Sequence, residues 1–265
     1  MRGNGNFQTA RQMVFVDGFP LHSLLRTRFN GAPQWNFVAA DETDHVNITY
    51  GPFSPKYSGN AMGGVVDIQT RQPQSLEWAL QTTGWIQDWE VGESKGVAPG
   101  VKTFFAHGNK IGKFSYYMFY NRLETQSQPT NLSTDTRITN AAGTTASTGA
   151  VRFKDARVRD AVLYGDDGET STTMDLVKIK MNYDVSSEFK LRGMIGYLDR
   201  HNEQLKVNNY LRDSSGNRIW SNNSIDLNGT TTFSVSENNF DVSTRDKQDL
   251  LIGLGANGKL SNGWN

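Results

Sequence analysis

Residues 50–71 read YGPFSPKYSGNAMGGVVDIQTR and separate two differently built parts of the chain. Glycines permit positive φ angles and close backbone approach, so the stretch is expected to turn sharply before the apolar run at 65–68, which predicts a strand. Upstream, the sequence is rich in glycine and has short apolar runs; downstream, long alternating segments are separated by tight turns and long polar stretches. The stretch therefore predicts a junction between two architectures.

The composition favours an all-β protein with many turns. The 265 residues include 26 glycines and only seven prolines, and 11% of them are aromatic. The 27 basic and 27 acidic side chains cancel, so no overall field points to nucleic acid as a partner. The absence of cysteine excludes disulfides and thiolate metal sites. No apolar run approaches the ~18 residues of a transmembrane helix, but membrane strands alternate in polarity and give only a weak hydropathy signal.

The junction resembles the end of the plug domain of TonB-dependent outer-membrane receptors. Plugs of this family typically finish in Gly-Pro, Tyr-Gly and Gly-Gly-Val patterns followed by Thr-Arg or Thr-Lys. Two upstream pieces join the resemblance, namely an Arg-Gly pair and an apolar-Asp-Gly-apolar-Pro strand and turn at 14–20. The positions that match are Arg2, Gly3, Asp17, Gly18, Gly51, Pro52, Tyr57, Gly59, Gly63, Gly64 and Arg71.

The resemblance covers roughly residues 2–73 and implies a division of the chain. Residues 1–73 are expected to form the C-terminal part of a small α+β plug, and residues 74–265 the first strands and outer loops of a transmembrane β-barrel. The family often has a Glu and an Arg just before the Gly-Pro pair, where this chain has Asn47 and Tyr50. A plug-to-barrel salt bridge is therefore not expected at these two positions.

Six long segments after residue 75 predict antiparallel, up-and-down strands. Each exceeds the ~9–11 residues that cross a membrane on a tilt. They lie near 76–91, 100–108, 113–125, 171–184, 189–197 and 245–259. The fourth shows the cleanest alternation, with Val177 and Ile179 opposite Lys178 and Lys180, a period of two that no helix gives. In the third, both faces carry aromatic side chains, so its facing stays undetermined.

The lengths of the connections give the strands a direction. Short turns follow the second, fourth and sixth strands, whereas the links near 127–170 and 206–244 are each roughly forty residues long. Since transmembrane barrels have short periplasmic turns and long outer loops, the long links are expected outside, together with a shorter outer link at 92–99. The resemblance implies about 22 strands around a plug, so six would form an incomplete barrel. We therefore expect the sequence to be a fragment, with Met1 an internal methionine of the receptor.

Catalytic and metal chemistry find little support in the sequence. The four histidines are scattered without metal-ligand spacing, which favours isolated structural or surface roles. The acidic cluster at 166–169 lacks the repeat of a calcium loop and is interpreted as a solvated turn. There is no Gly-x-Ser-x-Gly elbow and no defensible Ser, His and acid grouping. We therefore expect no enzyme activity, no cofactor and no metal site, although a barrel-embedded hydrolase with dispersed residues stays conceivable.

Three residues in the upstream part are candidates for ligand binding. Arg26 and Arg28 suit anionic ligands such as carboxylate-rich chelates, and Trp35 suits flat or sugar-like surfaces. The competing and favoured interpretation is structural: the arginines pair with barrel carboxylates, and the tryptophan packs at the plug wall.

The resemblance implies an importer in the outer membrane of a Gram-negative bacterium. Such receptors bind a scarce nutrient, commonly a ferric siderophore or similar chelate, and use TonB and the proton gradient to pull on the plug. The implied partners are the TonB complex, whose contact site is not expected in this sequence, a small ligand and outer-membrane lipid, with no nucleic acid. The alternative is a secreted or surface all-β binding or adhesion protein, such as a sandwich that packs its apolar faces into a core.

Overall fold

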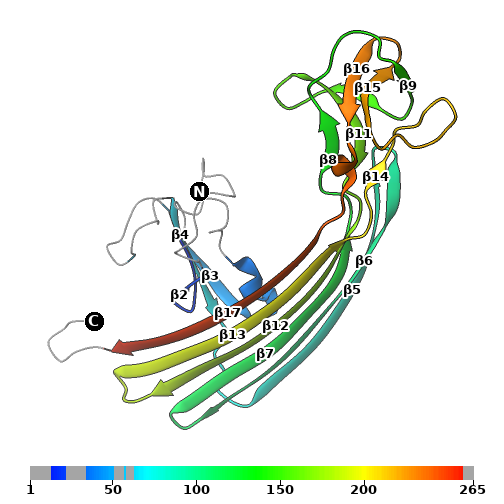
Figure 1. Ribbon diagram of the computed structural model, residues 1–265. Helices are drawn as coiled ribbons and strands as arrows, with labels where there is room; N and C mark the ends of the chain where they lie inside the picture. Colours follow the sequence, from blue (N-terminus) through cyan, green and yellow to red (C-terminus); the bar gives the residue numbers. More distant parts are fainter. Residues whose placement is uncertain (1–12, 22–33, 51–56, 58–62, 259–265) are drawn as a thin grey trace.

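A curved six-stranded sheet dominates the computed structural model, which describes residues 13–21, 34–50, 57 and 63–258. A small mixed sheet from the N-terminal part lies against the concave side of the curve (Figure 1). At one end of the long strands a separate group of short strands rises above the sheet (Figure 1). The two candidate sites described below lie where these parts meet.

The long strands form one antiparallel sheet in the order β17-β13-β12-β7-β6-β5. The sheet is open, and the six strands predicted from sequence are confirmed. They are β5 (Glu77–Val91), β6 (Ser94–Ile111), β7 (Phe114–Ser127), β12 (Thr170–Asp184), β13 (Phe189–Gln204) and β17 (Thr244–Gly258). Every strand is longer than the ~9–11 residues needed to cross a membrane on a tilt.

Two predicted turns lie elsewhere. The predicted outer link at 92–99 is wrong, because residues 94–99 belong to β6 and Ser94 pairs with Val91 of β5. The turn between the two strands consists of residues 92 and 93 alone. Gly92 has a φ of 58° and makes this tight reversal possible. At the other end β6 continues to Ile111, and the turn expected at 109–112 instead centres on Gly112, whose φ is 59°.

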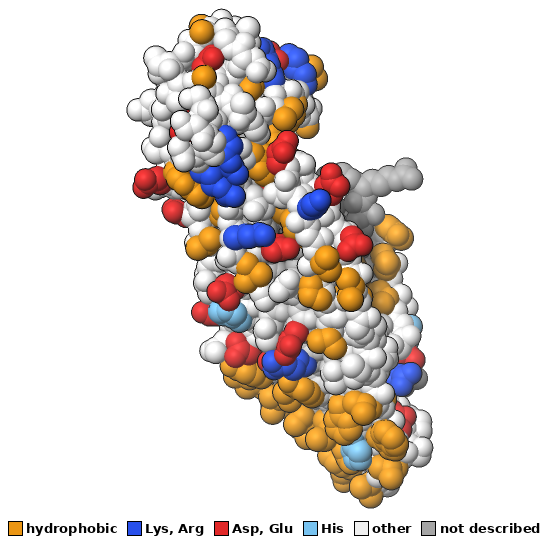
Figure 2. Space-filling view, turned by 90° about the vertical axis from the view of Figure 1, so that its right-hand side faces the viewer, with side chains coloured by type: hydrophobic (Ala, Val, Ile, Leu, Met, Phe, Trp, Pro, Cys, Tyr) orange, Lys and Arg blue, Asp and Glu red, His pale blue; other side chains and the backbone are white. Residues whose placement is uncertain are grey.

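The two faces of the sheet differ as the alternation predicts. On β12, Val177 and Ile179 are exposed on the convex face, while Lys178 and Lys180 are buried on the concave face. The convex face carries a broad set of exposed hydrophobic side chains, seen in Figure 2. The facing of β7, which the sequence left open, is settled by burial: Tyr117 and Phe119 face the concave side, and Met118 is exposed.

The N-terminal sheet has the strand order β2-β1-β4-β3, with β1 parallel to β4. Its strands are β1 (Met13–Val16), β2 (Phe19–Pro20), β3 (Thr43–Tyr50) and β4 (Gly64–Thr70), joined by the 3-10 turns η2 (Trp35–Phe37) and η3 (Ala40–Glu42). Its described residues include no α-helix, so the helical part of the expected α+β plug is not seen there. Val14, Val16 and Phe37 pack with Leu176 and Leu198 of the long sheet in one hydrophobic core.

The two long links fold together rather than forming open loops. They contain the strands β8 (Leu132–Asp135), β9 (Thr145–Ser147), β10 (Val151–Lys154), β11 (Asp160–Asp166), β14 (Asn208–Asn209), β15 (Asn222–Leu227) and β16 (Thr231–Val235), and the 3-10 turn η4 (Glu237–Phe240). Strands from the two links pair with each other, β11 with β14 and β9 with β15. Ile225, Phe233 and Tyr164 belong to a second hydrophobic core. We call residues 130–168 and 206–243 the outer unit.

Candidate functional site

The turn between β1 and β2 presents a carboxylate toward the long sheet. Asp17 and Gly18 both have positive φ, 48° and 78°, which the Asp-Gly sequence tolerates better than most pairs. Asp17 accepts hydrogen bonds from the backbone N–H of Thr70, at 2.9 Å, and from its hydroxyl, at 2.5 Å. The carboxylate is thereby fixed at the end of β4 and almost completely buried.

Lys180 of β12 reaches this carboxylate from the wall of the long sheet. Its ammonium lies 3.3 Å from Asp17 Oδ2 and donates hydrogen bonds to the carbonyl oxygen of Thr70, at 3.1 Å, and to the Thr70 hydroxyl. Only 4% of Lys180 is exposed. A buried ammonium needs such partners, because taking a charge out of water is costly unless it is paired and hydrogen-bonded.

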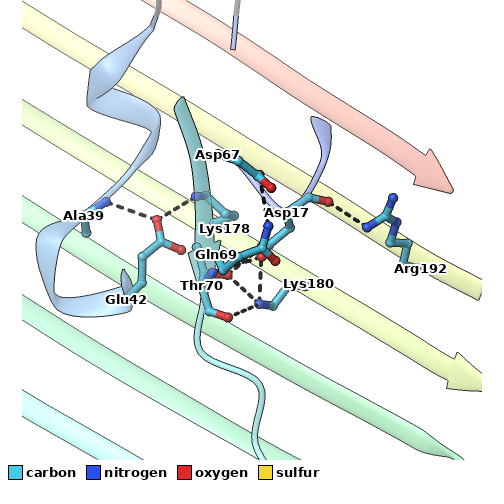
Figure 3. A network of polar contacts seen from close by, with 9 residues as sticks. All are labelled: Asp17, Ala39, Glu42, Asp67, Gln69, Thr70, Lys178, Lys180 and Arg192. Carbon is cyan, nitrogen blue, oxygen red and sulfur yellow. Dashed lines mark hydrogen bonds and ion pairs between the residues drawn. The ribbon is translucent and has the colours of Figure 1, made fainter. Parts of the chain in front are cut away.

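A second buried ion pair involves Lys178, two residues before Lys180 on β12 (Figure 3). Lys178 donates to Glu42 Oε1 at 2.7 Å, and the exposed fractions of the two side chains are 2% and 1%. The same oxygen accepts the backbone N–H of Ala39 at 3.1 Å. Burial raises the pKa of the Glu42 carboxyl above its ordinary value, and the Lys178 ammonium opposes this shift.

Two further cations belong to the long six-stranded sheet, which we call the wall. They reach the described N-terminal residues 13–21, 34–50 and 63–71, which we call the plug portion. Arg192 of β13 donates to the carbonyl oxygen of Asp17 at 3.0 Å and lies over the ring of Phe19, 5.5 Å from its centroid. Lys102 of β6 pairs with Asp41 at 2.5 Å. Three wall strands therefore supply cations, and the plug portion supplies carboxylates and carbonyl oxygens. Removing one partner of a buried pair is costly, so these contacts fix the position of the plug portion.

A polar cavity of about 610 Å³ lies at the outer end of the concave face. We call it the mouth cavity. Thr172 lines it and lies on the same face of β12 as the buried residues Met174 and Leu176, which places the cavity on the plug side of the sheet. Its lining includes Arg200, Arg245, Asp167 and Asp241, with hydroxyl and amide groups from Ser127, Thr130, Asn131, Ser133, Thr170, Asn202, Gln204, Asn239 and Ser243. This lining suits a hydrophilic ligand held by many hydrogen bonds.

Hydrogen bonds across the strand ends hold one side of the mouth cavity. Asp167 accepts the backbone N–H groups of Thr130 and Asn131 at 2.9 and 3.1 Å. Gln204 accepts the backbone N–H of Ser243 at 3.1 Å. The lining residues are thus fixed to one another before any ligand arrives, which reduces the entropy lost on binding.

The residues predicted from the plug motif are partly described. Asp17 and Gly18 form the turn that meets the wall, Gly64 begins β4 with a φ of 129°, and the Arg71 N–H donates to the carbonyl oxygen of Glu42 at 2.9 Å. Tyr57 packs against Phe15 with ring centroids 5.6 Å apart. Gly63 directly precedes β4. Arg2, Gly3, Gly51, Pro52 and Gly59 lie outside the described residues.

Only one of the three predicted ligand residues falls within the described part of the chain. Arg26 and Arg28 lie outside the described residues, and Trp35 is half exposed in η2 and does not line the mouth cavity. The sequence reasoning missed Glu42 and Asp41 as partners of the wall. The signal that it did find was the polar face of β12, where Lys178 and Lys180 alternate with apolar residues.

The acidic cluster is not a solvated turn. Asp166 is completely buried and accepts hydrogen bonds from the Tyr210 hydroxyl, from Asn208 Nδ2 at 2.7 Å and from the Gly168 N–H at 2.8 Å. The prediction of a solvated turn is wrong because the two side-chain donors, Tyr210 and Asn208, come from the other long link. Among the described residues no group of three or more potential metal ligands occurs, and His22 lies outside them.

None of the helices in the described part of the chain is both long and apolar enough to span a membrane.

Comparisons with known proteins agree with this geometry. Residues 1–65 match the family model described as the TonB-dependent Receptor Plug Domain. Among curated proteins, none matches the chain. Similar solved structures include the ferric enterobactin receptor PfeA of Pseudomonas aeruginosa, as the Q482A mutant with enterobactin, with a TM-score of 0.50 and 16% identity over 91% of this chain and 38% of that one.

Two further structures of that receptor give the same result. PfeA in complex with BCV-L6 has a TM-score of 0.51 and 16% identity, covering 96% of this chain and 40% of that one. The G324V mutant from Pseudomonas aeruginosa has a TM-score of 0.50 and 16% identity, covering 98% and 40%. The chain thus spans about two fifths of the length of these receptors and shares their fold. Residues 1–65 are thus similar to the plug domain of TonB-dependent receptors, and the strands that follow have the fold of the corresponding part of PfeA.

Proposed function

We propose that this chain belongs to an importer in the outer membrane of a Gram-negative bacterium, energised through TonB. In this proposal residues 1–73 belong to the plug, and residues 74–265 supply barrel strands and outer loops. The partners are outer-membrane lipid around the convex face and the TonB complex, whose contact site is not expected in this sequence. The chain acts as a transporter component rather than an enzyme and has no nucleic-acid partner.

The observation that carries the proposal is the plug portion held by charged contacts against the inner face of an amphipathic sheet. Glu42 and Asp17 meet Lys178 and Lys180 in a fully buried layer, while the opposite face of the same strands is apolar and exposed. Such a plug blocks its barrel at rest. Passage then requires these contacts to break or rearrange, and each buried charge left unpaired costs several kcal/mol, about 3–5. An external energy source meets this cost.

The mouth cavity supports a hydrophilic ligand, and we propose a ferric siderophore or similar chelate. Arg200 and Arg245 supply cations for anionic groups, and the surrounding hydroxyl and amide groups supply hydrogen bonds. The fold neighbour PfeA is a ferric enterobactin receptor and was solved in complex with enterobactin. The cavity lies above the plug portion on the same face, so a bound ligand would lie on the route that the plug closes.

A surface-exposed sandwich finds no support in the sheet. In a sandwich the apolar face of the sheet packs on a second sheet. Here Trp78, Leu80 and Ile86 of β5 are 71%, 63% and 76% exposed on the convex face, and the concave face is covered by the plug portion. A transporter wall therefore accounts for the exposed apolar convex face and for the plug-covered concave face, whereas an adhesion sandwich does not.

The test is uptake of labelled ferric chelates by cells that lack or carry the complete receptor. A panel that includes catecholate, hydroxamate and citrate chelates covers the main donor chemistries. We expect uptake of one class to depend on the receptor, on a functional TonB and on the proton gradient. Uptake that persists after a proton uncoupler or after loss of TonB would contradict the proposal.

An Arg200→Gln and Arg245→Gln double variant tests the mouth cavity in the same assay. Loss of these cations should weaken binding of an anionic chelate while the receptor still inserts into the membrane. The matched control is Lys154→Gln with Arg157→Gln, which removes the same charge from the outer unit away from this cavity. Equal affinity in both double variants would exclude the mouth cavity as the binding site.

A further inference from the structure

A second cavity, of about 600 Å³, lies where the outer unit meets the β5–β6 turn. Four cationic side chains line it, against one carboxylate, that of Glu93. The cations are Lys95, Lys206, Arg212 and Arg218. We call it the basic cavity. It differs from the mouth cavity, whose lining has equal numbers of arginines and aspartates.

The walls of the basic cavity are built rather than formed by chance exposure. The Tyr210 hydroxyl shares its one proton between Asp166 and the carbonyl oxygen of Val91, which lies 3.1 Å away, and this contact ties the outer unit to the end of β5. Gly149 has a φ of 83°, and a Cβ placed there would lie 2.0 Å from the Tyr210 carbonyl oxygen, so only glycine fits. Thr148 and Arg212 exchange backbone hydrogen bonds at 3.0 and 3.1 Å beside it.

The cations differ in how far their charge is already neutralised. Lys206 has a carboxylate partner, Glu169, at 3.7 Å. Arg212 donates to the backbone carbonyl oxygens of Asn209 and Leu211 at 3.0 and 2.9 Å, which leaves its charge uncompensated. Lys95 and Arg218 are exposed at the cavity, and Lys95 stands opposite Glu90 of β5. The cavity therefore has an excess of positive charge and suits an anion with several acceptor oxygens, such as a phosphoryl group.

The position of Lys95 identifies where that anion comes from. Lys95 stands on the convex face of β6, in the same alternating row as the exposed residues Val97, Val101 and Phe105, and at the outer end of that row. Figure 2 shows lysine and arginine side chains where the outer unit meets the sheet, above hydrophobic side chains on the sheet. Cations directly beyond an apolar, lipid-facing belt lie at the level of the lipid headgroups.

We propose that the basic cavity binds the phosphoryl headgroup of a lipid in the outer leaflet, with Lys95 and Arg218 as its main contacts. The inference rests on the proposed membrane placement of the sheet and assigns a lipid site distinct from the transported ligand. The bound lipid would couple the base of the outer unit to the membrane surface.

The test uses the complete receptor in detergent and measures binding of short-chain phosphatidic acid, phosphatidylcholine with the same chains, and inorganic phosphate. We expect a clear preference for phosphatidic acid. In Lys95→Gln with Arg218→Gln, affinity should fall roughly 25-fold, because each cation near an anionic surface contributes about fivefold. The control Lys154→Gln with Arg157→Gln should change it less than about twofold, and Lys95→Arg with Arg218→Lys should retain it.

Three results would overturn the inference. One is equal affinity for phosphatidic acid and phosphatidylcholine, another is unchanged affinity in the Lys95→Gln and Arg218→Gln variant, and the third is displacement of the lipid by inorganic phosphate at equal concentration, which would mark a free-anion site. Failure of the proposed function looks different. In that case the receptor would be absent from the outer-membrane fraction of cells, whereas a receptor found there with no lipid preference contradicts this inference alone.

Discussion

Glu42 and Lys178 lie 136 residues apart in sequence and form a buried ion pair between the plug portion and the wall. A buried pair adds little stability compared with apolar residues of the same shape, but it is costly to break on one side only. The pair instead fixes where the plug portion docks along β12, because the Glu42 carboxylate accepts hydrogen bonds from the Lys178 ammonium and from the Ala39 N–H.

Replacing one partner should therefore damage the plug more than replacing both. We expect Lys178→Met to destabilise plug docking by about 3–5 kcal/mol, because Glu42 is left buried without its cation. The double change with Glu42→Gln should recover most of this loss. Hydrogen exchange of the amides in β4, measured on the receptor in detergent, reports the free energy of opening.

Lys190→Met provides the control on the neighbouring strand. This lysine is 62% exposed and pairs with Asp184 at 3.4 Å, so its loss should cost less than about 1 kcal/mol. If Lys178→Met and Lys190→Met had equal effects on β4, the buried pair would have no role in docking the plug.

Tyr210 makes the stability of the outer unit depend on pH in the alkaline range. Burial, and then the hydrogen bond to Asp166, raises the pKa of Tyr210 to about 12 from an ordinary value of 10.0. Because the neutral phenol is favoured in the folded state, its contribution is complete below about pH 10 and is lost as the pH rises toward 12. Tyrosinate absorbance, compared with that of Tyr210→Phe, should show one phenol titrating late. A difference curve centred near 10 would contradict this assignment.

The residue scale is where the sequence predicted least. The alternation on β12 identified the polar face that carries Lys178 and Lys180, but not the acids that it meets. Asp17 and Glu42 lie in a turn and a 3-10 turn, where no periodicity marks a buried position. Only the three-dimensional arrangement brings these residues within reach of the wall, so sequence spacing could not reveal the pairs.

At the scale of elements, the long strands were predictable and the outer unit was not. Strands of 14 to 18 residues with two distinct faces leave a clear period of two, as β12 and β17 do. In the outer unit the strands have two to seven residues, too few to show alternation. Its pairing also joins two links that are far apart in sequence, such as β9 with β15.

The outer unit has its own core and should respond to core mutations independently of the wall. Ile225 is completely buried there, so Ile225→Ala should destabilise the unit by roughly 2–5 kcal/mol. Val242→Ala, at a position 60% exposed, is the control and should have little effect. Hydrogen exchange should rise in β11, β15 and β16 and stay unchanged in β7 and β12. Equal loss of protection in the long strands would show that the two parts form one cooperative body.

At the scale of the whole molecule, the sheet separates an apolar convex face from a concave face filled by the plug portion (Figure 1). A charge on the convex face should therefore oppose membrane insertion. Ile252→Arg, on β17 at a position 62% exposed, should cost up to about 2–4 kcal/mol in folding into lipid vesicles. Asn257→Arg, on the other face of the same strand, should cost less. Equal costs at the two positions would contradict a lipid-facing convex surface.

Under the proposed function, transport requires the plug portion to move away from the wall. Cysteines placed at Asp41 and Lys102, which pair across the boundary, can be joined by a short, cleavable thiol reagent in the complete receptor, once any cysteine outside this cysteine-free chain has been replaced by serine. We predict that the bridged receptor still binds its ligand but no longer imports it, and that cleavage restores import. Import at the normal rate through the bridged receptor would contradict the claim.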